Sequence, residues 1–379
     1  MLEKVLSSYG VLPEEIHVYG NGLINDTWKI RSSERTYLLQ RINDCVFKEP
    51  AKIDNNIRLI GRWLADKHPH YSFIQPIMSH SGEAIVHYPD YGYFRLFPFV
   101  EDSFAYDVVQ SPAQAYEAAR QFGLFARTLK DLPVRKLKTT LPCFHDLGAR
   151  FEKFRNAIKN GNALRITECS EIICFLRAHA HIVETFNNLK IEGGMKLRAT
   201  HHDTKISNVL FDQNGKGICV IDLDTLMPGY FISDVGDMIR TYVSPVSEEE
   251  KDYSRIEIRE EYFKAIVDGY LEQMGSELSA TELNQFVYSG LFMTYMQALR
   301  FLTDYLEDDS YYGASFEKQN YMRALNQATL LRKLLEKEAW MRAAVWNREA
   351  GGVRQEAGDL RREAAKPGRP KVRKSGRRV

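Results

Sequence analysis

The chain has 379 residues, of which 44% are hydrophobic and 12% aromatic, enough to bury one large core or two moderate ones. Its formal net charge is +1, but residues 342–379 hold twelve Lys or Arg against four Asp or Glu, a net +8 that leaves −7 on the rest. A mildly acidic main part argues against a nucleic-acid-binding surface there.

The cysteines and the N-terminus predict a cytoplasmic protein. The five cysteines are scattered and odd in number, which favours free thiols in a reducing compartment over a disulfide or zinc framework: Cys45, Cys143, Cys169, Cys174 and Cys219. Residues 1–4 begin a short amphipathic helix, and no apolar run approaches the roughly 20 residues that span a bilayer. We therefore expect no membrane partner, and the sequence leaves the oligomeric state open.

Three short runs at the start of the chain predict a meander of strands, at residues 16–19, 23–30 and 37–42. The first two flank a turn made of Gly20, Asn21 and Gly22. Glycine has no Cβ, so such a turn lets backbone N–H groups approach phosphates. Asn-Gly is also an ordinary hairpin dipeptide, so the turn by itself leaves both interpretations open.

The next segments complete a small mixed lobe. Residues 50–66 have the period of a helix with an apolar face, and residues 83–87 and 93–97 predict a second hairpin. The segment 98–102, which starts with a proline, interrupts this pattern and is placed where two lobes would hinge.

From residue 112 the sequence is mainly helical. Apolar residues recur with the period of a helix in five segments: 112–130, 147–159, 167–189, 291–306 and 317–343. Asp146 is suited to cap the second of these helices, with His145 either packed beside it or in contact with a substrate. Residues 345–379 are rich in Arg, Gly and Ala and predict a disordered basic tail, either solvated or weakly bound to polyanions.

The most informative segment is 200–224, which reads THHDTKISNVLFDQNGKGICVIDLD. Two apolar runs, 209–211 and 218–221, flank turn residues and predict a β-hairpin. The polar side chains therefore gather at the open end of this hairpin, which we call the catalytic end: His201, Asp203, Lys205, Asn208, Asp222 and Asp224.

Asp and Asn residues in this arrangement indicate phosphoryl transfer. Asp203 would orient a substrate hydroxyl and accept its proton, and Lys205 would reach the transferred group. Asn208 and Asp222 offer the hard oxygen ligands that Mg²⁺ prefers. The alternative is a surface hairpin with ordinary Asp turns and a buried His201. The compound pattern H-x-D-x-x-x-x-N followed by a strand pair that ends in Ile-Asp favours the catalytic interpretation.

Three motifs carry a resemblance to a known group: THHDTKISNVLFD at 200–212, IDLDTLMPG at 221–229 and SDVGDMIR at 233–240. They resemble the aminoglycoside phosphotransferases and choline kinases, which share the protein-kinase-like fold, and within that group the bacterial N-acetylhexosamine 1-kinases. The resemblance implies an α+β, bilobal protein, with a small β-sheet lobe at 1–97, a hinge at 98–102, a mainly helical lobe at 103–344 and the tail at 345–379.

The implied activity is transfer of the γ-phosphoryl of ATP, with Mg²⁺, to the anomeric hydroxyl of an N-acetylhexosamine, which places the protein in carbohydrate metabolism. By resemblance, the nucleotide would contact the Gly20, Asn21 and Gly22 turn, with Phe97 and Phe99 beside the adenine. A kinase-like protein would also have a phosphate-binding lysine on its third strand. Here the residues available are Gln40 and Arg41, of which only one can face the nucleotide because side chains alternate along a strand.

For the acceptor, the resemblance implies contacts from the catalytic end and from the helix segment LRFLTDYL at 299–306. The candidates are Asn25, Asp203, Asp224, Arg300, Asp304 and Tyr305. Other acceptors stay open: choline or ethanolamine, homoserine, methylthioribose and aminoglycosides. A cationic acceptor would use an acidic or aromatic cage, for which residues 307–312 (EDDSYY) are suitable. The absent lysine also keeps a nucleotide-binding pseudokinase as an alternative.

The helix that follows the catalytic hairpin contains three further polar residues of interest. Ser233 and Asp234 are suited to cap its start, and Asp234 is also placed to support the catalytic loop. For Arg240 we expect a structural ion pair.

Overall fold

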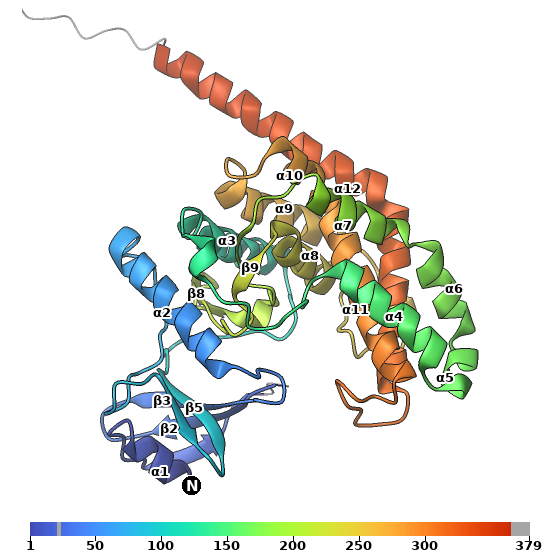
Figure 1. The fold of residues 1–379 in the computed structure, drawn as a ribbon. Coiled ribbons are helices and arrows are strands. Elements are labelled where there is room, and N and C mark those ends of the chain that lie inside the picture. Colours follow the sequence, from blue (N-terminus) through green and yellow to red (C-terminus); the bar gives the residue numbers. More distant parts are fainter. Residues whose placement is uncertain (21–23, 365–379) are drawn as a thin grey trace, which may run out of the picture.

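The sheet of the small lobe follows directly from the strand pattern. The computed structural model describes residues 1–20 and 24–364, and side chains up to Arg348. Five antiparallel strands lie in the order β1-β2-β3-β5-β4 (Figure 1). Their bounds are β1 Glu15–Val18, β2 Asp26–Arg31, β3 Thr36–Ile42, β4 Ile85–Tyr88 and β5 Gly92–Pro98. The predicted meander and hairpin are both confirmed.

The two faces of this sheet differ because side chains alternate along each strand. One face is apolar and packs on helix α1 (Leu2–Ser7), forming a separate small core that includes Ile30, Leu39 and Phe94. The other face has a polar centre formed by Gln40 and Arg95, which are paired across β3 and β5. This polar face lies toward the helical lobe, since Arg95 contacts that lobe at Asp224.

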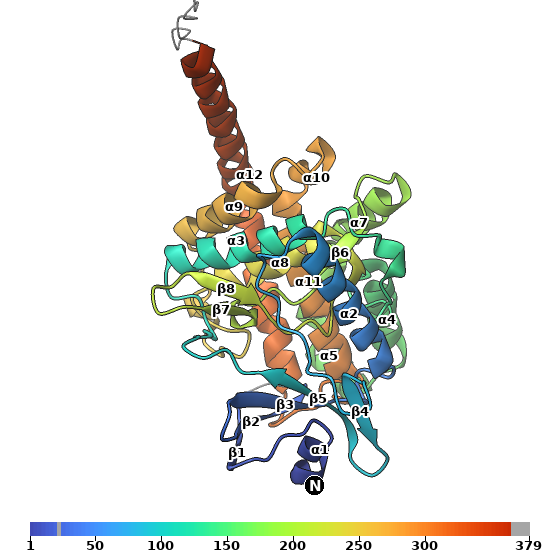
Figure 2. The ribbon, with the colours of Figure 1, turned by 90° about the vertical axis from the view of Figure 1, so that its left-hand side faces the viewer.

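Helix α2 (Pro50–Lys67) has the apolar face that its period predicts, and four of its aliphatic residues are fully buried: Ile53, Ile57, Ile60 and Leu64. These residues belong to the large core of the helical lobe, and not to the small core beneath the sheet. Figures 1 and 2 show α2 lying between the sheet and the helical lobe. The N-terminal segment thus contributes its helix to the packing of the other lobe.

A buried asparagine fixes α2 in this position. Asn56 is 0% exposed, and its Nδ2 donates to the carbonyls of Lys138 and Leu226, each at 2.8 Å. Its Oδ1 accepts from the N–H of Lys138, also at 2.8 Å. One amide side chain therefore satisfies three backbone groups of the helical lobe.

Replacing Asn56 should destabilise the protein. We expect Asn56→Leu to lower the free energy of unfolding by about 2 to 4 kcal/mol, because three buried backbone groups lose their partners. Chemical denaturation of Asn56→Leu and of Arg62→Ala, an exposed position on the same helix, measures the difference. A loss no larger for Asn56→Leu than for Arg62→Ala would contradict this account.

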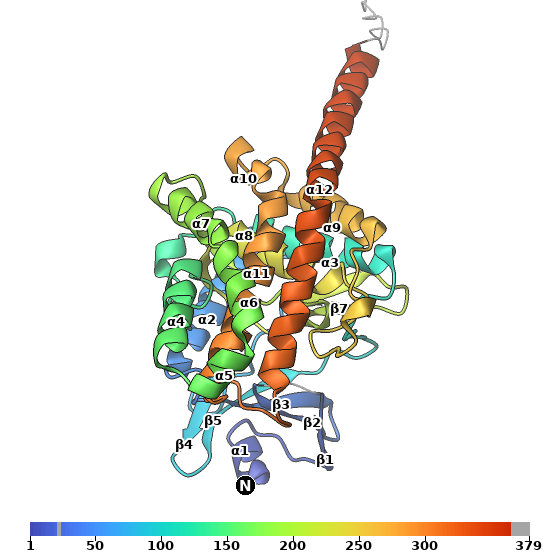
Figure 3. The ribbon, with the colours of Figure 1, turned by 90° about the vertical axis from the view of Figure 1, so that its right-hand side faces the viewer.

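The larger lobe is built around helix α11 (Phe286–Leu306), in which nearly every residue is buried. Figure 3 shows α11 between α4 and the long helix α12. The other helices are α3 Pro112–Thr128, α4 Leu147–Asn160, α5 Ala163–Glu168, α6 Ser170–Ala178, α7 His181–Ile191, α8 Phe231–Tyr242, α9 Glu260–Met274, α10 Ala280–Asn284 and α12 Gln319–Ala364. Two short strand pairs complete the lobe: β6 Arg198–Thr200 with β9 Met227–Gly229, and β7 Val209–Phe211 with β8 Gly217–Val220.

Most helices agree with the predicted segments, with two differences. The segment 167–189, predicted as one helix, is divided among α5, α6 and α7. The predicted tail from 345 also differs, because α12 continues to Ala364. Residues 345–364 are rich in Ala, Glu and Arg, which have high helix propensity even where they have no apolar face to bury. Residues 365–379 of the predicted tail lie outside the described residues.

Asp146 caps α4 as predicted, its carboxylate accepting from the N–H of Ala149 at 3.1 Å. Within residues 1–20 and 24–364, no helix is both long and apolar enough to cross a membrane.

Candidate active site

The predicted catalytic hairpin is present and brings its polar residues together. Strands β7 and β8 pair antiparallel, with Val209 opposite Val220. At the open end of the hairpin, next to this residue pair, the N–H of Ile221 donates to the carbonyl of Asn208 at 2.9 Å. The Nδ2 of Asn208 donates to the carbonyl of Asp203 at 2.8 Å. The loop that carries Asp203 is thus tied to the base of the hairpin.

Asp203 and Lys205 form an ion pair within this loop. The Lys205 Nζ lies 3.4 Å from the Asp203 Oδ1. Burial alone would raise the pKa of Asp203, but the Lys205 ammonium leads the opposing effects and holds the pKa below its ordinary value. The same carboxylate raises the pKa of Lys205. Asp203 is therefore ionised at neutral pH and able to accept a proton.

Asp222 has the properties of a metal ligand. It follows β8 with a positive φ of 59°, and within the described residues its carboxylate accepts no hydrogen bond and forms no ion pair. Although Asp222 is exposed, the protein around it, followed by repulsion from the Asp224 and Asp203 carboxylates, raises its pKa to about 7. A hard divalent cation would relieve this repulsion, and the amide oxygen of Asn208, at the same end of the hairpin, suits the same cation. Asn208 and Asp222 therefore fit Mg²⁺.

Helix α8 holds the catalytic loop through buried carboxylates. The two oxygens of Asp234 accept from the N–H groups of His201 and His202 at 3.1 and 2.8 Å. Asp237 accepts from the N–H of Thr204 at 2.9 Å. Burial raises the pKa of Asp234 to about 6. The supporting role predicted for Asp234 is confirmed.

The cap predicted at Ser233 or Asp234 is wrong. The helix begins at Phe231, so both residues lie inside it, and Tyr230 at the N-cap position makes no side-chain capping bond. Arg240 forms the predicted structural ion pairs, with Asp237 at 2.8 Å and Glu248 at 2.6 Å.

His202, the residue before Asp203, is locked in an unusual backbone conformation. Its φ is 67°, and its Nδ1–H donates to the carbonyls of Thr200 and Thr225. Burial lowers its pKa to about 4, so the ring is neutral. A Cβ at Gly229 would lie 2.4 Å from His202 Nε2, so only glycine leaves room for the imidazole. This packing holds the backbone in a fixed conformation immediately before Asp203.

The structure settles the register of β3. Gln40 lies on the face toward the helical lobe, and its Oε1 accepts from the guanidinium of Arg95 at 2.9 and 3.1 Å. Arg41 points to the opposite side, where it is 45% exposed and pairs with Asp26 at 2.5 Å. Of the two candidates, Gln40 is therefore the one near the site.

Arg95 is the functional candidate that the sequence reasoning missed. Its side chain is 2% exposed, and its Nη1 lies 2.5 Å from the Asp224 Oδ1, so a buried ion pair joins the two lobes. Asn25 adds a second link, donating through Nδ2 to the Asp224 Oδ2 at 2.8 Å. A lone arginine in the apolar strand YFRLF (93–97) was the signal available in the sequence.

Aromatic side chains continue this face of the sheet toward the hinge. The Arg95 guanidinium lies 5.1 Å from the centre of the Phe97 ring, and the Lys29 Nζ lies 3.8 Å from that of Phe99. Tyr19 packs edge-on against Phe99, with 5.8 Å between ring centres. Phe97 lies within β5, and Phe99 directly follows that strand in the predicted hinge. Their place beside an adenine stays a prediction.

The glycine turn is described only in part. Gly20 has a φ of 76°, a left-handed conformation that favours glycine. Asn21 and Gly22 lie outside the described residues.

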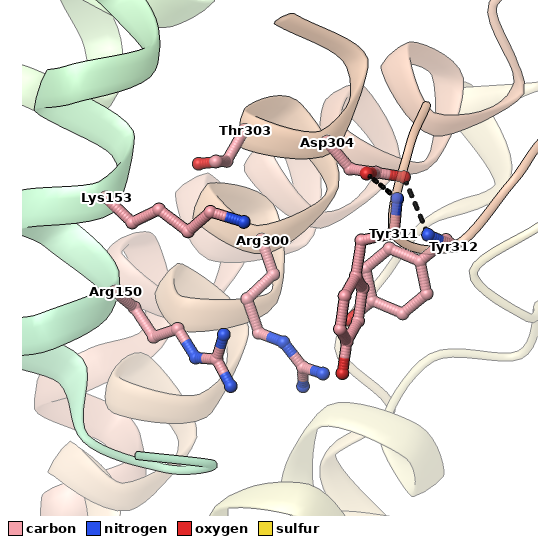
Figure 4. Close-up of a pocket in the computed structure, with 7 residues that line it drawn as sticks. All are labelled: Arg150, Lys153, Arg300, Thr303, Asp304, Tyr311 and Tyr312. Carbon is pink, nitrogen blue, oxygen red and sulfur yellow. Dashed lines mark hydrogen bonds between the residues drawn. The ribbon is translucent and has the colours of Figure 1, made fainter. Parts of the chain in front are cut away.

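The three acceptor candidates of α11 are separated by the fold. Arg300 and Asp304 both line a pocket (Figure 4), but the Asp304 carboxylate accepts from the N–H groups of Tyr311 and Tyr312 and holds the loop after α11. Tyr305 does not line this pocket: its hydroxyl donates to Glu168 and its ring stacks on Tyr321. Of these three residues, Arg300 is the one whose side chain has no charged partner among the described residues.

The bilobal α+β architecture, with Asp203, Asn208 and Asp222 gathered at one end of a hairpin, is that of a small-molecule kinase of the protein-kinase-like fold. The chain belongs to the phosphotransferase enzyme family, whose model matches residues 15–275. The resemblance of the motifs to the aminoglycoside phosphotransferase and choline kinase group is thereby confirmed, whereas the closer resemblance to N-acetylhexosamine 1-kinases stays a prediction.

Solved structures with the same fold are distant in sequence. An aminoglycoside phosphotransferase from Alicyclobacillus acidocaldarius matches with a TM-score of 0.62 and 13% identity, over 90% of this chain and 95% of that one. An amicoumacin kinase in complex with AMP-PNP, Ca²⁺ and Ami matches with a TM-score of 0.60 and 15% identity, over 88% of this chain and 92% of that one. An ethanolamine kinase from Plasmodium vivax matches with a TM-score of 0.56 and 15% identity, over 85% of this chain and 84% of that one.

Proposed function

We propose that this protein transfers the γ-phosphoryl of ATP to the anomeric hydroxyl of an N-acetylhexosamine and releases the sugar 1-phosphate and ADP. The observation that carries the proposal is the Asp203 carboxylate, kept ionised by Lys205 at 3.4 Å and tied to Asn208. The motif resemblance at 200–240 supports the choice of a sugar acceptor.

In the proposed reaction, Asp203 hydrogen-bonds the acceptor hydroxyl and accepts its proton as the oxygen attacks the γ-phosphorus. The new bond joins this oxygen to phosphorus, and the bond from the γ-phosphorus to the bridging oxygen of ADP breaks. Lys205 stabilises the transferred phosphoryl group. Mg²⁺ held by Asn208 and Asp222 would neutralise charge on the phosphates.

The nucleotide is proposed to lie between the sheet and the catalytic end. Phe97 and Phe99 are suited to flank the adenine, and the Gly20, Asn21 and Gly22 turn to approach the phosphates. Gln40 and Arg95 are on the sheet face that would meet them. The amicoumacin kinase, which has the same fold, was solved with AMP-PNP and Ca²⁺, which supports a nucleotide with a divalent cation here.

The charges near the acceptor side disfavour choline and ethanolamine. The pocket beside α11 is lined by three basic residues, Arg150, Lys153 and Arg300. The acidic residues proposed for a cationic cage are already paired: Glu307 with Lys153 at 3.0 Å, and Asp308 and Asp309 with Arg165 at 3.6 and 2.6 Å. A cationic acceptor would be repelled by this pocket.

The acceptor is tested with a panel assayed for ADP release and by phosphorus NMR of the product. We expect transfer to N-acetylglucosamine- or N-acetylgalactosamine-type sugars, with an anomeric phosphate in the product, and no transfer to choline, ethanolamine, homoserine or an aminoglycoside. Turnover of choline without any sugar would overturn the proposed acceptor. Nucleotide binding without turnover of any member would favour a pseudokinase instead.

A further inference from the structure

A basic pocket lies between α4, α11 and the loop after α11 (Figure 4). The pocket and the open solvent at its mouth together amount to about 300 Å³. Its lining residues are Arg150, Lys153, Arg300, Thr303, Asp304, Tyr311 and Tyr312. We call it the arginine pocket.

Arg300 is buried in this pocket without an anionic partner. Its side chain is only 8% exposed, and its Nε is fully buried and makes no hydrogen bond among the described residues. Its one side-chain hydrogen bond is from Nη1 to the Gln297 amide oxygen at 3.2 Å. The guanidinium otherwise lies near aromatic rings, 5.0 Å from the centre of Phe144 and 5.4 Å from that of Tyr312. A buried charge left in this state is costly unless a ligand completes it.

Arg150 adds a second guanidinium to the same space. Its Nε and Nη2 both donate to the carbonyl of Phe144, and it has no carboxylate partner in the described part of the chain. Burial lowers the pKa of Arg150, and the charge of Arg300 lowers it further, so the two cations are close enough to repel each other. Figure 4 shows both guanidinium groups directed to the same side of the pocket.

The remaining charges of the arginine pocket leave it positive. Lys153 pairs with Glu307 at 3.0 Å. Asp304 accepts from the N–H groups of Tyr311 and Tyr312 and from the Asn320 amide, which are neutral donors. Two guanidinium groups against the single carboxylate of Asp304 therefore leave a net positive charge in the pocket.

Aromatic contacts connect this pocket to the catalytic loop. Phe144, which lies by Arg300, stacks on His145 with 4.3 Å between ring centres. His145 in turn packs on His202 at 5.1 Å, and His202 directly precedes Asp203. The arginine pocket, between α4 and α11, thus lies to one side of the catalytic end.

We propose that the acceptor carries an anionic group, which Arg150 and Arg300 bind while its hydroxyl meets Asp203. This inference rests on the proposed function and narrows its substrate class to sugars that bear a carboxylate or a phosphate. Guanidinium groups match both anions because their N–H donors form a planar fork. Either anion would supply the negative partner that the two arginines do not find among the described residues.

The test compares matched acceptors that differ only in charge. We would measure kcat/KM for N-acetylglucosamine, for the same sugar with a carboxylate on its 3-oxygen substituent, and for its 6-phosphate. One anionic sugar should exceed the neutral sugar by about tenfold to a hundredfold, as expected for a charge-assisted hydrogen-bonded pair. Which of the two is preferred distinguishes carboxylate from phosphate.

Variants then assign the preference to the pocket. Arg300→Gln should bring the ratio of anionic to neutral kcat/KM close to one, mainly by raising KM for the anionic sugar. Arg155→Gln is the matched control, because Arg155 is on the same helix as Arg150 but is exposed and pairs with Glu152, and it should keep the ratio. Equal turnover of neutral and anionic sugars would overturn this inference and leave the proposed function intact. Turnover of none would overturn both.

Two further measurements exclude other roles for Arg300. Without ligand, Arg300→Gln should melt no lower than the wild type, since it removes an unpaired buried charge, whereas a structural arginine would lower the melting temperature. Sulfate added to an assay with the neutral sugar should not raise turnover. Activation by sulfate that Arg300→Gln abolishes would make the pocket a regulatory anion site and contradict an acceptor role.

Discussion

Asp203→Asn is expected to lower kcat for phosphoryl transfer by about 10²- to 10⁴-fold, the usual contribution of a positioned acid or base. The amide keeps the size of the side chain and its place beside Lys205, but it cannot accept the hydroxyl proton. Affinity for the nucleotide should change little, because Asn208 and Asp222, the proposed metal ligands, are untouched. ADP release measures the first effect, and titration calorimetry with a non-hydrolysable nucleotide measures the second.

Asp212→Asn is the matched control for this prediction. Asp212 lies at the opposite, turn end of the same hairpin, where its Oδ1 accepts from the N–H groups of Asn214 and Lys216. An asparagine can make the same turn contacts, so transfer should stay near the wild-type rate. If Asp203→Asn retained turnover similar to that of Asp212→Asn, Asp203 would not be the base.

The catalytic hairpin was predictable because its polar residues lie close together in the sequence. Asp203, Asn208 and Asp222 lie within 20 residues, and a turn of ordinary composition folds them to one end. The supporting role of Asp234 also followed from its position at the start of the next helix. In these cases the chain between the partners is short, and its strand and turn patterns fix their relative positions.

The register of β3 and the role of Arg95 were not predictable in the same way. Alternation in a strand allows either Gln40 or Arg41 to face the site, and only the packing of the opposite face on α1 decides between them. Arg95 reaches Asp224 across a separation of 129 residues. No local pattern specifies such a pair, because it depends on how the two lobes meet.

The sequence did not distinguish Arg300 from the two other polar candidates on α11, for a related reason. Arg300, Asp304 and Tyr305 are close in sequence, but successive helix positions point in different directions. Asp304 is captured by backbone groups of the loop 307–318, and Tyr305 packs toward Glu168 and Tyr321. The sequence showed three polar residues on one helix, and the loop closure that leaves Arg300 alone appears only in the fold.

Arg95→Met is expected to lower the free energy of unfolding by about 3 to 5 kcal/mol, the usual loss when one partner of a buried ion pair is removed. Asp224, 2% exposed, would keep its charge with only the Asn25 amide as a side-chain partner. Denaturant unfolding measures the loss. Arg41→Met, which breaks an exposed pair with Asp26 on the neighbouring strand, is the control and should cost less than about 1 kcal/mol. Equal losses for both variants would contradict the importance of the buried pair.

The double variant Arg95→Met, Asp224→Leu tests the electrostatic role of Arg95 as well as its role in stability. Removing both charges leaves no unpaired ion, so most of the lost stability should return. In Arg95→Met alone, turnover should also fall, because Arg95 opposes the repulsion among the carboxylates at the catalytic end and so helps to hold down the pKa of Asp222. With Arg95 gone and Asp224 kept, Asp222 would bind a proton more readily and Mg²⁺ more weakly at neutral pH. The double variant also removes the Asp224 charge, which raises the pKa of Asp222 more than Arg95 lowers it, so part of the turnover should return with the stability. A double variant that regained stability but no turnover would contradict this electrostatic role of Arg95.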